Sequence, residues 1–117
     1  MPLSPACLPA VELFNRGAYF ACHEALEPLW LAASEPERTL LHALIQAAAA
    51  LHHLQRGNQK GARSVWQRAK EKMLALPPHL IEPELNELLP QIEAALDSGT
   101  AAFALPQIKL TSLSAFK

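Results

Sequence analysis

The spacing of apolar residues is the feature that most constrains how this chain folds. Apolar residues recur every three to four positions over long stretches, and almost no segment alternates apolar and polar residues as a half-buried strand does. Glycines and prolines separate these stretches. The pattern predicts an all-α protein, a small helical bundle of about five helices built from two αα-hairpins. The expected helices cover residues 8–15, 18–33, 37–56, 59–76 and 83–97.

Capping signals predict where these helices end and begin. Gly17, Gly57 and Gly99 each follow a helical stretch, at the position where a left-handed residue commonly ends a helix. Ser34 and Asn58 are expected to cap the N-termini of the two helices that follow them. The Arg-Gly joints that contain Gly17 and Gly57 resemble each other. An internal repeat and the chance similarity of two helix–Gly–helix joints both explain this likeness.

Length and composition narrow the class of protein. A chain of 117 residues is expected to form a single helical domain, residues 1–117, and is long enough to bury a core. It contains no run of about 20 apolar residues that would span a membrane, and its N-terminus lacks the basic and apolar segments of a signal peptide. Two cysteines are too few for a disulfide framework, and a net charge of -1 gives no general attraction to nucleic acid or anionic lipid. We expect a cytoplasmic protein.

The stretch FACHEALEPLW carries the strongest candidate for a site. At 100° per residue, His23 and Glu27 fall on the side of the helix that carries three aromatic residues, Tyr19, Phe20 and Trp30. This placement predicts a buried His/Glu/Trp motif, and a buried carboxylate is costly unless it is paired or bound. Three interpretations remain open. The pair is a structural hydrogen bond, part of a metal site, or a general acid–base pair.

Further polar side chains on the expected third helix extend this site. Gln46 and His53 lie on one stripe of that helix, and they would converge with His23 and Glu27 if the stripe borders the second helix. The metal-ligand candidates are therefore His23, Glu27 and His53, and they suit a divalent metal such as zinc, manganese or iron. Tyr19 and Trp30 are the candidates for the walls of a pocket between the two helices, and Gln46 is the candidate that lines it and orients His53 or a bound water molecule. A small polar ligand is the alternative occupant.

The remaining histidines and the basic residues of the fourth helix receive more ordinary interpretations. His42 and His52 are expected to be packed or partly exposed, and His79 is expected in a loop. Five basic residues on the fourth helix do not form one stripe and have no aromatic residues among them, so the pattern does not favour nucleic-acid binding. We expect them instead to form a solvated surface that the acidic fifth helix complements. These five are Lys60, Arg63, Arg68, Lys70 and Lys72.

Two blocks of sequence resemble a known family. The segments FNRGAYFACHEALEPLW and LIQAAAALHHLQRGNQKGA, in this order, are similar to the bacterial and archaeal domain-of-unknown-function family 309 over about residues 11–76. The resemblance rests on a His-x-x-x-Glu-x-x-Trp motif, here His23, Glu27 and Trp30. It implies a small, cytoplasmic, all-helical protein, and a metal-binding role for the motif. It implies no established activity.

Two classes of function therefore compete. In one, the chain has a metal-dependent or acid–base site for a small substrate. In the other, it is a helical protein-interaction module in which the His23–Glu27 pair is structural. The C-terminal segment is too apolar for a free end, which predicts either a homodimer or docking of the segment on its own core. Its large apolar residues are Phe103, Leu105, Ile108, Leu110, Leu113 and Phe116.

Overall fold

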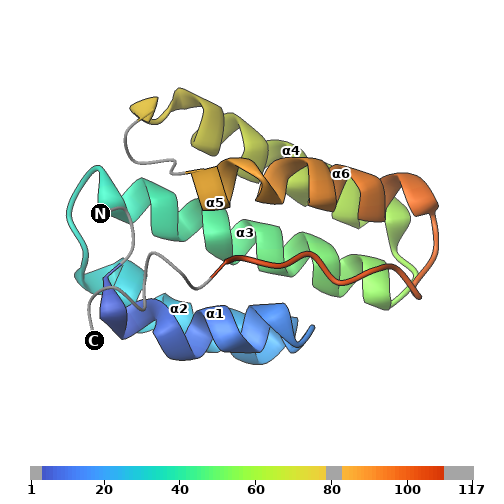
Figure 1. Ribbon diagram of the computed structural model, residues 1–117, viewed down its shortest axis with the longest axis horizontal. Coiled ribbons are helices and arrows are strands. Elements are labelled where there is room, and N and C mark those ends of the chain that lie inside the picture. The colour runs from blue at the N-terminus through green and yellow to red at the C-terminus, as the bar shows by residue number, and fades with distance from the viewer. Residues whose placement is uncertain (1–3, 79–82, 110–117) are drawn as a thin grey trace.

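Two αα-hairpins form the body of the protein. The computed structural model in Figure 1 describes residues 4–78 and 83–109, and within them it contains helices and no strand. Its elements are η1 (Pro5–Cys7), α1 (Leu8–Asn15), α2 (Tyr19–Ala32), α3 (Glu37–Gln55), α4 (Gln59–Ala75), α5 (Pro83–Asn86) and α6 (Leu88–Ser98). Helices α1 and α2 form the first hairpin, α3 and α4 form the second, and α2 packs against α3 where the two meet. The predicted all-α fold is confirmed.

The turns inside the two hairpins have the same geometry. Gly17 and Gly57 have φ values of 81° and 79°, the left-handed conformation that glycine adopts without a Cβ clash. Each turn contains the same pair of backbone hydrogen bonds. The amide of Gly17 donates to Phe14 at 2.9 Å and that of Ala18 to Leu13 at 2.9 Å, while the equivalent bonds of the second turn measure 3.0 and 2.9 Å. This pair of bonds is the Schellman arrangement that satisfies the last carbonyl groups of a helix.

The start of α3 differs from the prediction, whereas the start of α4 agrees with it. The Ser34 side chain does not cap α3. The Glu35 carboxylate accepts hydrogen bonds there from the amide of Thr39 at 3.1 Å and from its hydroxyl at 2.6 Å. At α4, Asn58 is the cap, and its Oδ1 accepts from the amide of Gly61 at 2.9 Å.

The helix expected over residues 83–97 is divided in two. Helix α5 ends at Asn86, and α6 begins at Leu88. Pro90 explains the break, because a proline ring clashes with the carbonyl group four residues earlier, here that of Asn86. Near the start of α6 the proline is tolerated, since the first amide groups of a helix have no partner within it.

One hydrophobic core joins the helices. The central helix α3 contributes an alanine run, and Ala43, Ala47, Ala48 and Ala50 are completely buried. These small side chains let α2 and α4 approach α3 closely from its two sides (Figure 1). None of the helices in residues 4–78 and 83–109 is long and apolar enough to cross a membrane.

The chain after α6 docks on the core. In Figure 1 it runs back across the molecule between α6 and α1. Phe103 and Ile108 are buried. The Asn15 side chain donates to the carbonyl of Ile108 at 2.8 Å and accepts from its amide at 2.7 Å. This part of the C-terminal segment therefore packs on its own chain, while Leu105 is exposed. His79, Leu110, Leu113 and Phe116 lie outside the described residues.

Candidate functional site

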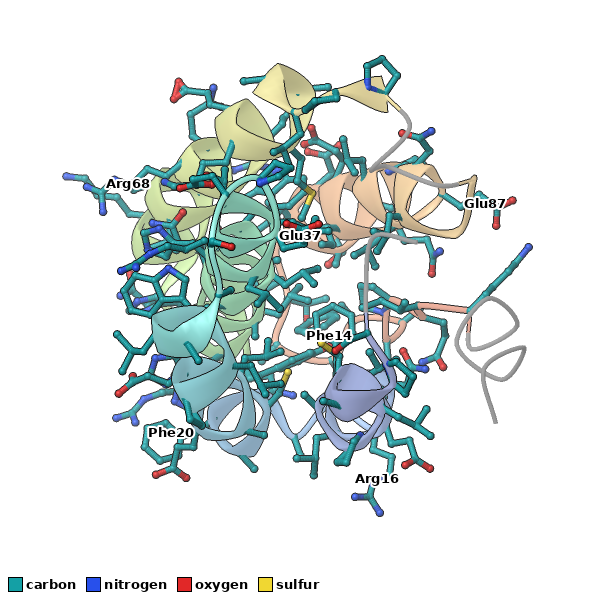
Figure 2. All side chains as sticks on the ribbon, turned by 90° about the vertical axis from the view of Figure 1, so that its left-hand side faces the viewer. Phe14, Arg16, Phe20, Glu37, Arg68 and Glu87 are labelled. Carbon is teal, nitrogen blue, oxygen red and sulfur yellow. The ribbon has the colours of Figure 1, made fainter. Side chains whose placement is uncertain are left out.

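The helix that carries the motif buries one side only. Tyr19, Cys22 and Leu26 of α2 are buried in the core. Phe20, on the opposite side, projects outward, whereas Phe14 of α1 points into the interior (Figure 2). Tyr19, Cys22 and Leu26 therefore mark the buried side of α2, and Phe20 lies away from it.

His23 and Glu27 lie at the border of this buried side, and the prediction of a buried motif is wrong. Their side chains are 36% and 51% exposed, with His23 Nε2 and Glu27 Oε2 3.5 Å apart. At 100° per residue, His23 points about 70° and Glu27 about 110° away from the mean direction of the buried residues. The pair is therefore within ion-pair reach, as predicted, but water reaches it.

The α3 histidine that shares a ring neighbour with His23 is His52, through Phe20. The Phe20 ring lies 6.3 Å from the His23 ring and 6.0 Å from the His52 ring, so it connects the two helices. His53 faces the α3–α4 turn, where its Nδ1 lies 3.2 Å from Asn58 Nδ2. Because consecutive residues of a helix are 100° apart, a one-residue difference moves the imidazole to another side of α3.

The predicted metal site is not formed. Within residues 4–78 and 83–109, no group of three or more His, Cys, Asp or Glu side chains is placed to hold a metal ion, and so His23, Glu27 and His53 do not form one. The two cysteines do not extend the pair. Both are buried, and burial raises the pKa of the Cys22 thiol to about 12. A thiol of such high pKa stays protonated near neutral pH and is a poor nucleophile or metal ligand.

Trp30 and Tyr19 do not face each other across one pocket. Trp30 stacks on His42 of α3, with ring centroids 4.7 Å apart and planes inclined by 21°. The Arg38 guanidinium lies 5.3 Å from the centre of the Trp30 ring, within the range of a cation–π contact. Tyr19 instead packs in the core, edge-on to Phe14 at 5.3 Å. The two aromatic residues therefore lie near opposite ends of α2 and contact different neighbours.

Gln46 retains one feature of the predicted site. Its Oε1 atom is buried and has no hydrogen-bond partner among the described residues. Gln46 lies four residues after His42, so it follows His42 on the same side of α3. An unpaired buried acceptor carries a free-energy cost that a donor from a ligand or a water molecule would offset.

Two histidines of α3 have a lowered pKa, which favours their neutral form. The pKa of His42 is lowered by desolvation first, and then by the positive charges of Lys72 and Arg38. The pKa of His52 is lowered by desolvation, and then by Arg56 and His53. Both rings are therefore mostly neutral at pH 7, which suits stacking on aromatic side chains.

The face can be described as one unit, which we call the α2–α3 face. It consists of Phe20, His23, Glu27, Trp30, Leu31, Arg38, His42 and His52. Phe20 lies near His52, and Trp30, ten residues later, lies near His42, ten residues earlier. The two helices are therefore antiparallel neighbours. A short connection between two helices makes them antiparallel neighbours. Aligning α2 with α3 in this way could have identified His42 and His52 from the sequence.

Comparison with known proteins places this face within a family. A family model described as "Domain of unknown function (DUF309)" matches residues 8–65. Over these residues, the chain belongs to the DUF309 family. The DUF309 region begins and ends earlier than the predicted span of residues 11–76. It contains α1, α2, α3 and the beginning of α4, and with them the whole α2–α3 face.

An uncharacterized protein of Aquifex aeolicus (strain VF5) is similar to this chain. The two are 31% identical over 94 residues, which are 80% of this chain and 28% of the Aquifex protein. The chain therefore spans just over a quarter of the length of that relative. No solved structure matches the chain.

Proposed function

We propose that this chain is a helical protein-interaction module that docks a partner protein on the α2–α3 face. The observation that carries the proposal is the exposure of two large apolar side chains on one side of α2. Phe20 is 57% and Leu31 58% exposed. They lie eleven residues apart, roughly 16 Å along the helix axis, on either side of His23 and Glu27.

The chemistry of this face suits a protein partner. Aromatic and arginine side chains are enriched at protein interfaces, and tryptophan, tyrosine and arginine supply most binding hot spots. Trp30 and Arg38 already hold each other in place through their 5.3 Å contact, so less side-chain entropy is lost on binding. The His23–Glu27 pair would supply polar contacts between the two apolar anchors.

The partner that fits is a protein segment with apolar side chains spaced to meet Phe20 and Leu31. An amphipathic helix presents such side chains along one face. In the Aquifex relative, the similar region makes up 28% of a longer chain. A region that occurs as one part of a larger protein is consistent with a module.

Paired substitutions test the proposal. The variant Phe20→Ala/Leu31→Ala removes both anchors without touching the core, and Leu74→Ala is the matched control because Leu74 is an exposed apolar residue of α4. A partner captured by the wild type should bind the purified Leu74→Ala variant equally well. It should bind the double variant at least about tenfold more weakly, since loss of a hot spot costs 2 kcal/mol or more. Equal binding to all three proteins would refute the proposal.

A small polar ligand or a metal ion at His23 and Glu27 is the second candidate. The unpaired Gln46 oxygen favours it, because a donor from a ligand or a water molecule would offset the cost of this buried acceptor. His23 and Glu27 supply only two ligands, so a metal ion would need further ligands from a bound molecule or a partner.

A further inference from the structure

Four of the five basic side chains of α4 fall into two groups. Arg63 and Lys70 point to α6, where Arg63 Nη2 lies 3.1 Å from Asp97 Oδ1 and Lys70 Nζ lies 2.6 Å from Glu93 Oε1. Arg68 and Lys72 form no ion pair with any residue in the described part of the chain. The acidic helix α6 therefore neutralises one side of α4 and leaves the other side positively charged.

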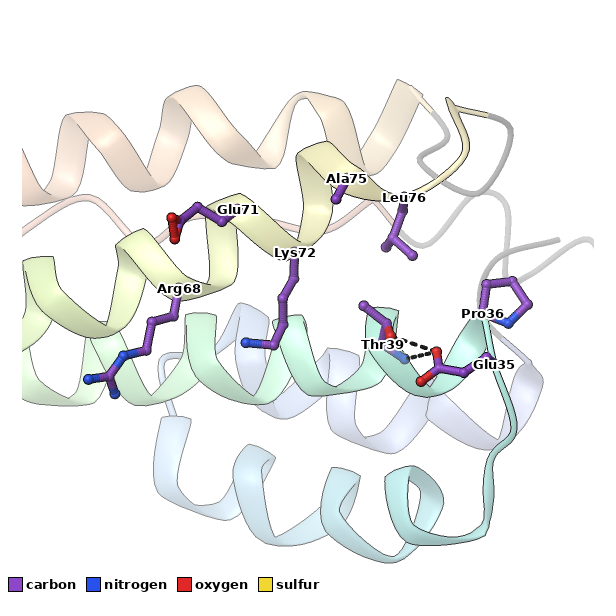
Figure 3. Close-up of a pocket in the computed structure, with 8 residues that line it drawn as sticks. All are labelled: Glu35, Pro36, Thr39, Arg68, Glu71, Lys72, Ala75 and Leu76. Carbon is purple, nitrogen blue, oxygen red and sulfur yellow. Dashed lines mark hydrogen bonds between the residues drawn. The ribbon is translucent and has the colours of Figure 1, made fainter.

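This charged side borders an open cleft between α3 and α4. The cleft has a volume of about 540 Å³, within the range of small-molecule sites. Figure 3 shows Arg68 and Lys72 extending from α4 toward α3 at this cleft. Pro36, Ala75 and Leu76 supply apolar surface beside them.

The two acidic residues that line the cleft form no ion pair with these cations. Glu35 is already engaged, because its carboxylate accepts from both the amide and the hydroxyl of Thr39. Glu71 extends in a different direction from Arg68 and Lys72 (Figure 3), and it forms no ion pair within the described residues. Arg68 and Lys72 therefore extend toward α3 without an ion-pair partner among the described residues, although the four charged side chains that line the cleft sum to zero.

We propose that this cleft binds a small organic anion, through a phosphate or carboxylate group held by Arg68 and Lys72. The two cations are four residues apart and so lie next to each other on α4. An arginine fork and a lysine ammonium together can hold one such group. The apolar surface of Pro36, Ala75 and Leu76 receives the rest of the molecule. None of these residues belongs to the α2–α3 face, so the proposal does not depend on partner docking there, although the cleft borders that face where Lys72 approaches His42.

His42 gives the site an independent reporter. Lys72 is one of the charges that lower the pKa of His42. An anion bound to Lys72 cancels part of that charge, and the pKa of His42 should then rise. A merely non-specific association elsewhere on the surface would leave this pKa unchanged.

Calorimetric titration with pyrophosphate and with citrate tests the proposal and distinguishes the two anionic groups. The variants are Arg68→Gln and Lys72→Gln. The matched control is Lys60→Gln, since Lys60 is an exposed cation of α4 that does not line the cleft. At least one of the two anions should bind. Its affinity should fall about tenfold in each cleft variant, as expected for the loss of one charge-assisted hydrogen bond, and should be unchanged in the control.

Nuclear magnetic resonance titration of His42 completes the test. Saturating anion should raise the pKa of His42 in the wild type and in Lys60→Gln, but not in Lys72→Gln. Three results would overturn the proposal. These are binding of neither anion, an equal loss of affinity in the Lys60→Gln control, and a His42 pKa that does not respond to the bound anion.

Discussion

His23 and Glu27 occupy the border between the core and the solvent, and this position determines what they contribute. An ion pair with exposed side chains is worth about 0–1 kcal/mol, because water screens it. A fully buried pair would have to overcome a desolvation cost of several kcal/mol. With His23 Nε2 and Glu27 Oε2 3.5 Å apart and both side chains at least one-third exposed, the pair adds little to stability. Its polar atoms remain available for binding.

Replacing Glu27 by leucine tests the role of the pair. Because the side chain is half exposed, Glu27→Leu should change the free energy of unfolding by less than about 0.5 kcal/mol, measured by urea denaturation. Leu26→Ala, on the buried side of the same helix turn, should cost about 2–5 kcal/mol. A large destabilisation by Glu27→Leu would show that the pair is structural.

The same variant decides between the two candidate functions. If His23 and Glu27 hold a metal ion, elemental analysis should find stoichiometric metal in the wild type and none in Glu27→Leu. If the α2–α3 face docks a protein, partner affinity should depend on Phe20 and Leu31 and should be nearly independent of metal chelators.

The sequence could identify the motif residues but not their surroundings. The angular calculation placed His23 and Glu27 correctly relative to each other, and their proximity is confirmed. It took the aromatic residues as markers of the core direction, and this assumption failed at Phe20. A helix with apolar residues on most sides has no unique buried direction until its neighbours are known. The contacts of Trp30 with His42 and of Phe20 with His52 depend on how two helices pair. The periodicity of one helix does not say which residues of its neighbour it contacts.

At the scale of the elements, local signals were sufficient for most of the fold. Four of the predicted helices end within one residue of their observed boundaries, because glycine and asparagine caps act locally. The capping of α3 by Glu35 rather than Ser34 required knowledge of the turn geometry. The division of α5 from α6 was predictable in principle, since Pro90 was a sufficient signal that the periodicity obscured.

The N-terminus of α4 offers a sharp prediction. A Cβ atom at Gly61 would lie 2.5 Å from Asn58 Nδ2, so Gly61→Ala should displace the capping side chain and destabilise the protein. Asn58→Ala alone removes the cap and should cost about 1 kcal/mol. In the Asn58→Ala background the obstacle is gone, and Gly61→Ala should then stabilise by roughly 0.5–1 kcal/mol, because alanine is the better helix former.

Thermal unfolding of the four proteins of this double-mutant cycle measures the coupling directly. Asn58→Asp is the control, because its carboxylate retains the acceptor for the Gly61 amide. Additive effects of the two alanine substitutions would contradict the clash.

At the scale of the whole molecule, the C-terminal segment connects the first helix to the last. Phe103 stacks on Tyr19 of α2 at 6.4 Å. The backbone amide of Gln107 donates to the Gln91 side chain of α6 at 2.8 Å. The segment therefore closes the side of the core that the two hairpins leave open. Phe103 and Ile108 therefore need no second subunit to cover them, whereas Leu105 is exposed. The homodimer stays a prediction.

Asn15 is the residue that tests this arrangement, because its side chain makes both hydrogen bonds to the backbone of Ile108. Asn15→Ala should lower the free energy of unfolding by about 1–2 kcal/mol, since two such bonds contribute roughly 0.5–1.5 kcal/mol each. It should also speed hydrogen exchange at the Ile108 amide. Asn15→Asp keeps only the acceptor and should have an intermediate effect. Light scattering should give the same mass for Asn15→Ala as for the wild type, whether that mass corresponds to one chain or two. A mass that changes when the segment is loosened would mean that the segment docks between chains, and the closure of each core by its own C-terminal segment would be wrong.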